Sequence, residues 1–189
     1  MIDNEKMKEW AKQIYEIACA HGWHEESKPD GLWMALVVSE VAEAIEADRK
    51  NRRVTEESLE KFIAVTTESD GYKVSDLMWK TAFEQYIKGS LEEEIADVII
   101  RLLDFINMRW GDKYDWWYSP SNFRIPDDFA VASWHLVKEI LNTGSMNVRD
   151  AIQYALEWSE KLNINISQFI EWKMKYNSLR SYKHGGKKY

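Results

Sequence analysis

The stretch that decides the fold is residues 33–46, WMALVVSEVAEAIE. In an α-helix, with about 100° between successive residues, Glu40 and Glu43 lie about 60° apart on one face. Trp33 and Leu36 share that face, so both carboxylates stand in an otherwise apolar stripe. Burying a carboxylate without a cation is costly and raises its pKa. The stretch therefore predicts a helix that is apolar round most of its circumference, central in the fold, and chemically active on one side.

A second stretch, LEEEIADVIIRLLD at residues 91–104, repeats the pattern. On a helix, Glu94, Asp97, Arg101 and Asp104 share an arc of about 80°, beside a sector filled by Leu, Ile, Val and Phe. If the two helices pack antiparallel, the four carboxylates of the two E-x-x-[ED] pairs converge between them. The sequence thus predicts one acidic site built from two helices.

Such a cluster suits a hard cation, because Mg²⁺ prefers oxygen ligands and leaves positions for water and phosphate oxygens. The structural alternative is a solvated acidic face, stabilised within each helix by Arg101 and Lys50. Two acid pairs on two strongly apolar helices favour the metal interpretation.

The rest of the chain also follows the helical period, and no alternating strand pattern is present. Residues 51–89 are less regular, with a helix start at Thr55 and an Asp70-Gly71 turn; Ser90 and Glu93 form a capping-box pattern. The fold class expected is all-α, a single domain over residues 1–189 built as an antiparallel helical bundle, with a helical insertion at 51–89 and a basic C-terminal tail at 181–189. The helices are expected at about residues 3–21, 31–50, 90–109, 128–142, 147–162 and 166–180, with an aromatic loop at 111–126.

Composition narrows the class of protein further. The chain has 189 residues, 45% of them hydrophobic, and only 11 Gly and Pro, which argues against disorder and against a turn-rich β fold. The ten Trp residues are expected mainly in the core and at a subunit interface, with a stacking surface for a flat ligand as the alternative. Cys19 is the only cysteine, and neither a membrane-spanning apolar run nor a signal peptide is evident, so a cytoplasmic setting is expected.

Charge is distributed unevenly along the chain. The net charge is −7, yet residues 172–189 hold six Lys and Arg and no acidic residue, which leaves −13 on the first 171 residues. An acidic body with a short basic tail is a poor nucleic-acid binder. It suits a site where carboxylates gather metal ions and the tail meets anionic oxygens.

The C-terminal segment supplies groups for such anions. On a helix, Lys173, Tyr176, Asn177 and Arg180 lie within about 100° of one another. A forked guanidinium, point-charge ammonium groups and an amide suit a polyphosphate. The alternative is a set of cations favoured by the helix dipole, followed by a disordered tail.

Together these motifs resemble the MazG-like branch of the all-α nucleoside triphosphate pyrophosphatases. The resemblance covers less than half of the chain. The segments that carry it, in the order of that family, are HGWHEE (21–26), LVVSEVAEAIEADRK (36–50), LEEEIADVIIRLLD (91–104) and KMKYNSLRSYKHGGKK (173–188).

The resemblance implies a helical bundle assembled as a homodimer or homotetramer. It implies Mg²⁺-dependent hydrolysis, with Mn²⁺ as a substitute, of a nucleoside triphosphate to monophosphate and pyrophosphate, in the service of nucleotide-pool house-cleaning. Glu40, Glu43, Glu94 and Asp97 match the metal-binding catalytic acids. On the substrate side, the resemblance implies phosphate-binding roles for Lys173, Asn177 and Arg180, and a position near the base for Trp23. From the basic tail itself, we expect Lys183 and Lys187 to close over the triphosphate together with Arg180.

Several points stay open on the sequence. Either Glu40 or Glu43 is a candidate for the base that takes the proton of the attacking water, and Asp104 is a candidate for orienting Arg101 or a water. The base preference is open, so a dUTP- or dCTP-specific enzyme of the same superfamily is one alternative. A non-catalytic helical oligomer that binds a structural cation is another.

Overall fold

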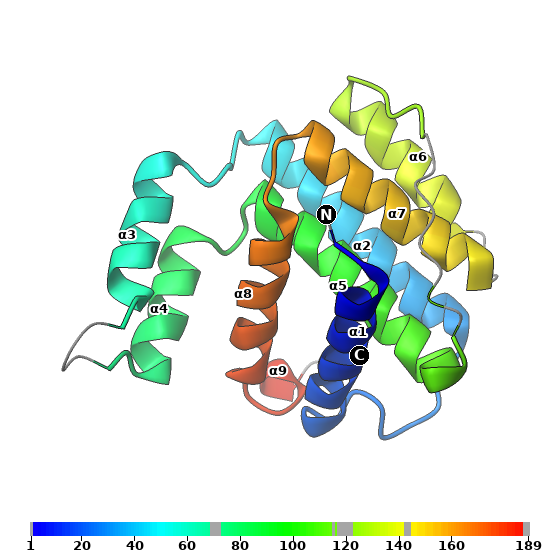
Figure 1. Ribbon diagram of the computed structural model, residues 1–189, viewed down its shortest axis with the longest axis horizontal. Helices are drawn as coiled ribbons and strands as arrows, with labels where there is room; N and C mark the ends of the chain where they lie inside the picture. The colour runs from blue at the N-terminus through cyan, green and yellow to red at the C-terminus, as the bar shows by residue number, and fades with distance from the viewer. Residues whose placement is uncertain (1, 69–72, 115, 117–122, 142–144, 187–189) are drawn as a thin grey trace.

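The computed structural model describes residues 2–68, 73–114, 116, 123–141 and 145–186, and within these ranges every regular element is a helix. The all-α prediction is therefore confirmed for the described residues (Figure 1). The elements are α1 (Asn4–Ala20), α2 (Asp30–Arg49), α3 (Glu56–Thr66), α4 (Asp76–Tyr86), α5 (Leu91–Trp110), the 3₁₀ turn η1 (Gly111–Lys113), α6 (Phe129–Leu141), α7 (Ser145–Lys161), α8 (Ile166–Ser178) and the short α9 (Lys183–Gly186).

Helix α5 lies at the centre of the bundle, packed against α1, α2, α7 and α8 (Figure 1). This differs from the expectation that the helix at 31–50 is central. The physical reason is that α2 packs chiefly on α5 and α6, and several of its residues, including Ala35 and Glu43, stay exposed. In α5, by contrast, nearly every apolar side chain is buried.

The start of α5 follows the predicted capping pattern. The Ser90 hydroxyl accepts a hydrogen bond from the Glu93 backbone N–H, and the Glu93 carboxylate accepts one from the Gly89 N–H at 2.7 Å. The first of these bonds satisfies an N–H that the first helical turn leaves without a partner, and the second binds the residue just before the N-cap. It also holds the Glu93 side chain beside the helix rather than in solvent.

Residues 51–89 form a helical hairpin, α3 and α4, which projects from one side of the bundle (Figure 1). Thr55 caps α3 as predicted, by accepting a hydrogen bond from the Ser58 N–H. Phe62 is fully buried between Trp79, Phe83 and Trp172, so aromatic packing attaches the hairpin to α8. The predicted Asp70-Gly71 turn lies outside the described residues.

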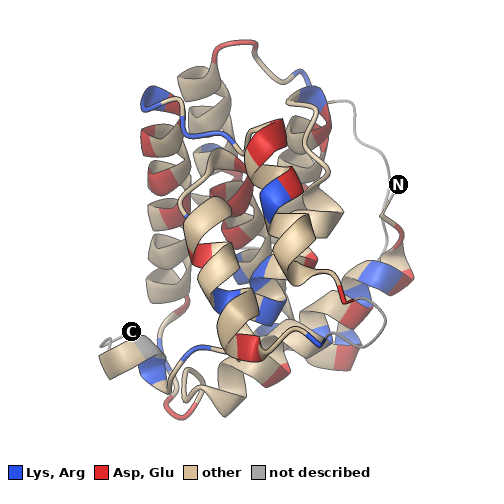
Figure 2. Ribbon diagram, turned by 90° about the vertical axis from the view of Figure 1, so that its left-hand side faces the viewer, with Lys and Arg blue, Asp and Glu red and all other residues tan. Residues whose placement is uncertain are grey.

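Trp10, Trp33, Trp79 and Trp158 are at least nine-tenths buried in the core, and Trp110, Trp116 and Trp172 pack against it, as expected from composition. Acidic and basic positions are interspersed along the helices (Figure 2). Among the described helices, none combines the length and apolar character needed to cross a bilayer.

Candidate functional site

Helices α2 and α5 run antiparallel, as the acidic-site prediction requires. Asp30 at the start of α2 forms an ion pair with Arg109 near the end of α5. Beyond the other end, the Arg52 carbonyl accepts a hydrogen bond from the Leu91 N–H that opens α5. The acid pairs of the two helices therefore face each other near the middle of the contact.

Three of the four predicted acids converge. Glu40, Glu43 and Glu94 each offer a carboxylate oxygen within 4.8 Å of the other two, and we call these three residues the triad. Glu40 and Glu94 are each only 5% exposed, whereas Glu43 is exposed to solvent. The triad is thus a largely buried group of oxygens with one open side.

The electrostatics of the triad are unfavourable without a cation. Burial, followed by the negative charges of Glu93, Asp97 and Glu43, raises the pKa of Glu94 to about 9. Burial and the charge of Asp97 also raise the pKa of Glu40 to about 7, although Arg101 opposes the shift. Glu94 makes no hydrogen bond or ion pair with any other described side chain, so its carboxylate is available to a ligand.

Glu40 has one protein partner. The Arg101 Nε donates a hydrogen bond to a Glu40 oxygen at 2.5 Å, from α5 to α2. The sequence suggested that Arg101 stabilises an acidic face within its own helix, but in the structure it pairs across the two helices. The guanidinium therefore fixes the Glu40 carboxylate through its Oε1 atom.

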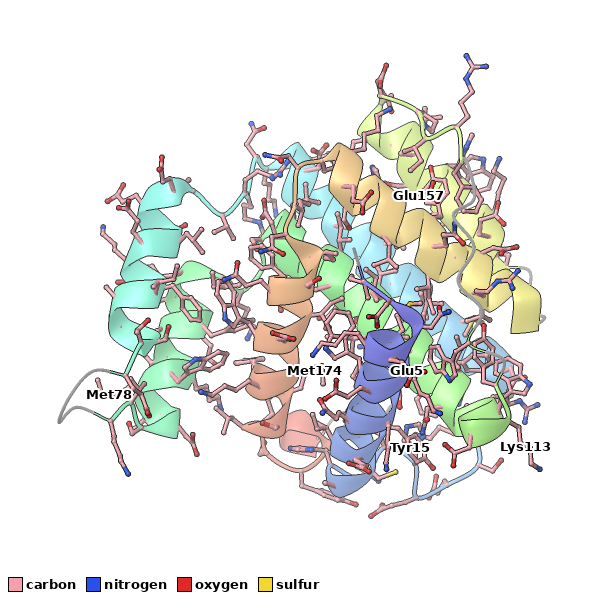
Figure 3. The ribbon with its side chains drawn as sticks, in the orientation of Figure 1. Glu5, Tyr15, Met78, Lys113, Glu157 and Met174 are labelled. Carbon is pink, nitrogen blue, oxygen red and sulfur yellow. The ribbon has the colours of Figure 1, made fainter. Side chains whose placement is uncertain are left out.

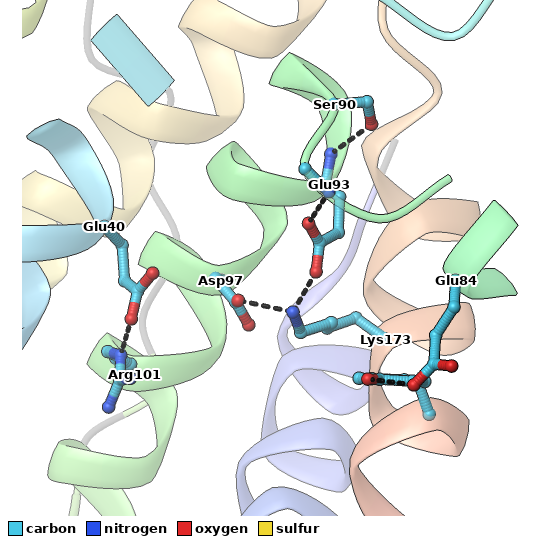
Figure 4. Close-up of polar contacts among 9 residues, drawn as sticks. Glu40, Glu84, Ser90, Glu93, Asp97, Arg101 and Lys173 are labelled. Atoms are coloured by element: carbon cyan, nitrogen blue, oxygen red, sulfur yellow. Dashed lines mark hydrogen bonds and ion pairs between the residues drawn. The ribbon is translucent and has the colours of Figure 1, made fainter. Parts of the chain in front are cut away.

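The fourth acid, Asp97, is held differently. The Lys173 ammonium of α8 forms an ion pair with Asp97 at 2.6 Å and another with Glu93 (Figure 4). Lys173 is 5% exposed and Glu93 is 2% exposed, so both charges are buried. Burial alone lowers the pKa of Lys173, but the carboxylates of Asp97 and Glu93 outweigh it, and the net shift is upward.

A cavity of about 90 Å³ adjoins this acidic region between α1, α5 and α8. Asp97 and Arg101 form part of its wall and connect it to the triad, since Arg101 binds Glu40. Its apolar wall includes Ile14, Ile100 and Met174, and Figure 3 shows Met174 on α8 where that helix faces α1. A pocket with one apolar wall and a few polar groups is the usual form of a small-molecule site.

Three predicted substrate residues line this cavity: Trp23, Asn177 and Arg180. The Oδ1 atom of Asn177 is buried and has no hydrogen-bond partner in the structure. A buried amide oxygen without a partner costs free energy that a bound donor would recover. Asn177 therefore brings to the cavity wall an amide whose oxygen meets no partner within the protein.

The tail meets the loop that follows α1. The Tyr182 hydroxyl donates to Glu25 at 2.6 Å, and the Lys183 ammonium lies 3.4 Å from the same carboxylate. The Lys183 backbone N–H also donates to the His21 carbonyl. These contacts place Lys183 beside the cavity loop rather than beside the triad, and Lys187 lies outside the described residues.

Sequence reasoning gave no site role to Glu93 or His24. The Nε2 atom of His24 lies 2.9 Å and 3.1 Å from the two oxygens of Asp104, and the imidazole ring packs at a tilt against the rings of Tyr15 and Trp33. Asp104 thus binds a histidine 80 positions away, a pairing that no local pattern reveals. The sequence placed Glu93 only in the capping pattern. That pattern accounts for its hydrogen bond with the Gly89 N–H but not for its ion pair with Lys173.

The donor set of the triad fits a hard divalent cation. Carboxylate oxygens are the ligands that Mg²⁺ and Mn²⁺ prefer, and a six-coordinate ion keeps its remaining positions for water or phosphate. In an octahedral Mg²⁺ site, adjacent ligand oxygens lie about 3 Å apart and opposite ones about 4 Å, so the three side chains would have to rotate toward one another to share an ion. The carboxylate of Glu94, buried and without a partner, provides the specific support for this fit.

We compared the chain with models of protein families, with curated proteins and with solved structures, and none of them matches it.

Proposed function

We propose that the protein is a Mg²⁺-dependent nucleoside triphosphate pyrophosphohydrolase of the MazG-like type, which converts an NTP or dNTP to the monophosphate and pyrophosphate. The observation that carries the proposal is the placement of a metal-compatible triad beside a cavity that holds an unpartnered amide and Arg180. The triad suits the metal that accompanies a triphosphate, and the cavity suits the organic part of the nucleotide. The motif resemblance points to the same reaction.

The reaction joins a water oxygen to the α-phosphorus and breaks the bond from that phosphorus to the pyrophosphate oxygen. A bound Mg²⁺ would neutralise phosphate charge and lower the pKa of water. Glu40 and Glu43 remain the candidates to take the proton from the attacking water. Burial raises the pKa of Glu40 to about 7 in the metal-free protein, and a bound Mg²⁺ would favour its ionised, proton-accepting form.

The positively charged groups of the chain orient the substrate. Arg180 lies in the cavity wall and can donate two parallel hydrogen bonds to a phosphate. Arg101 lies between the cavity and the triad, where it fixes Glu40. Catalysis of phosphoryl transfer is mainly positioning and charge stabilisation, and these groups supply both.

The test is a panel of canonical and modified NTPs and dNTPs with Mg²⁺, with products resolved as monophosphate plus pyrophosphate or diphosphate plus phosphate. We expect pyrophosphate release from at least one nucleotide, and the panel also reveals whether the enzyme prefers dUTP or dCTP. Glu40→Gln should abolish turnover while the protein stays folded. The control is Glu46→Gln, on the same helix, where the glutamate pairs only with Arg49 and Lys50 at the surface.

Two results would contradict the proposal. Near-normal activity of Glu40→Gln would remove the triad from the reaction. Binding of Mg²⁺ without hydrolysis of any nucleotide in the panel would favour the non-catalytic alternative, in which the cation is structural.

A further inference from the structure

The carboxylates of this region fall into two groups that are neutralised in different ways. The triad faces one side of α5, with Arg101 on Glu40 and no partner on Glu94. Glu93 and Asp97 face α8, and we call these two acids with Lys173 the lysine site. Figure 4 shows Asp97 and Glu93 meeting the ammonium of Lys173, while the Glu40–Arg101 pair lies on another side of α5.

The ammonium of Lys173 is fixed in place by several contacts. Glu93 is itself held by the Gly89 N–H at 2.7 Å, so the capped start of α5 presets its position. The ammonium also lies 5.6 Å from the centre of the Tyr176 ring, and Tyr176 is 2% exposed. A buried ammonium with two carboxylates has the pairing that a buried charge requires, and it has little freedom to leave.

Formal charges separate the two groups. With all acids ionised, the triad and Arg101 carry −2, which one divalent cation neutralises. Glu93, Asp97 and Lys173 carry −1, so a divalent ion there would be in excess and would sit against the ammonium. Like charges in a poorly solvated site repel strongly, because the local dielectric constant is low.

We propose that Lys173 supplies, at Glu93 and Asp97, the positive charge that a second divalent cation would otherwise supply, so that each chain binds one divalent ion, at the triad. The inference rests on the metal site of the proposed function and deepens it. Asp97 is then a partner of Lys173 and not a ligand of the ion. Lys173 is then a positioning residue, and the contacts with phosphate are left to Asn177 on α8 and to Arg180, just after the helix ends.

The test counts Mn²⁺ ions bound to the full-length, metal-free protein, by calorimetric titration and by the electron paramagnetic resonance of free Mn²⁺. We expect one ion per chain in the wild type and two in Lys173→Met, which keeps most of the side-chain volume but loses the charge. Lys175→Met is the matched control on the same helix; Lys175 is exposed, its ammonium lies over the Trp79 ring, and the count should stay at one. Two ions of similar affinity in the wild type, or one ion in a folded Lys173→Met, would overturn the inference.

Two further variants keep the inference testable if Lys173→Met does not fold, since it leaves two buried acids without a partner. Asp97→Asn should still bind one Mn²⁺, whereas Glu94→Gln should bind none at concentrations that saturate the wild type. Loss of the ion in Asp97→Asn would make Asp97 a ligand and refute the inference.

The outcomes are independent of the proposed reaction. A protein that binds one Mn²⁺ but hydrolyses no nucleotide would refute the proposed function alone. A protein that releases pyrophosphate with two Mn²⁺ bound per chain would refute the role of Lys173 alone.

Discussion

At the scale of single residues, Glu94 combines burial with the absence of a partner. It is 5% exposed, it faces two other glutamates, and its pKa is raised to about 9. In the unfolded chain a glutamate ionises near pH 4.3. The folded protein therefore binds more protons than the unfolded chain between about pH 4 and pH 9 when no metal is present.

This difference predicts how stability depends on pH. The free energy of unfolding falls as pH rises wherever the folded state binds more protons, so the metal-free protein should lose stability from about pH 4 upward, with the loss complete above pH 9. Glu40 adds to the loss up to about pH 7. Glu94→Gln should remove part of the slope and raise the melting temperature in EDTA at pH 9. Thermal unfolding at pH 6 and pH 9, in EDTA, measures this dependence of stability on pH.

Added Mg²⁺ should stabilise the wild type most at pH 9, because the ion binds ionised carboxylates. Glu46→Gln, which changes an exposed glutamate on α2, is the control and should keep the wild-type slope. Equal slopes in the wild type and in Glu94→Gln would show that Glu94 is not the destabilising group.

At the scale of elements, successive turns of α8 carry one residue of the lysine site and one residue of the cavity wall. Lys173 faces α5 and binds Asp97, and Asn177, one turn later, lines the cavity. Arg180 follows the end of the helix and also lines the cavity. The segment beyond it turns back to the loop after α1, where Tyr182 binds Glu25. One helix and its extension thus join the acidic region to the organic pocket.

Shortening the chain after Leu179 tests the role of this extension. Loss of Arg180 should lower kcat/KM by about 10-fold or more, equivalent to roughly 1.4 kcal/mol of transition-state binding. Folding should change little, because the lost contacts of Tyr182 and Lys183 are largely at the surface.

Shortening after Gly186 is the matched control, since it removes Lys187 but keeps Arg180 and Lys183. If both truncated proteins keep wild-type kcat/KM, the tail does not contact the phosphates. If both lose activity equally, the group that matters is Lys187 or a neighbour in the last three residues.

At the scale of the whole molecule, several large apolar side chains stay exposed on the surface of the bundle. On α6, Val131, Trp134 and Leu141 lie along one face, and Trp134 and Leu141 are 58% and 61% exposed. A second apolar set lies on the α3–α4 hairpin, where Leu77 is 74% exposed. Large exposed apolar patches commonly mark contacts between proteins.

We therefore expect at least a homodimer in solution. Light scattering at micromolar concentration should give twice the mass of the chain or more, and Trp134→Glu should shift the protein toward the monomer because it places a charge on the contact face. Leu77→Glu makes the same change on the hairpin and tells which apolar set forms the contact. An active wild-type monomer would refute this expectation.

Most of the fold was predictable because helices depend on local patterns. The period of apolar residues located α1, α2 and α5 to within a residue or two at each end, and Thr55 and Ser90 cap helices where the sequence placed caps. These features involve residues three or four positions apart, which a helix brings together whatever surrounds it. The same spacing placed Glu40 and Glu43 on one face of α2, whereas their meeting with Glu94 also required that α2 and α5 pack antiparallel.

The tertiary structure alone decided which partner each charge meets. Helical spacing gives the direction of a side chain about its own axis but not the helix that packs against it. Asp97 shares a face with Glu94, yet α8 brings Lys173 to it from 76 positions away, and His24 reaches Asp104 from 80. A buried charge takes the partner that packing brings within about 3 Å, and that choice depends on how α5, α8 and the loop after α1 are placed in space.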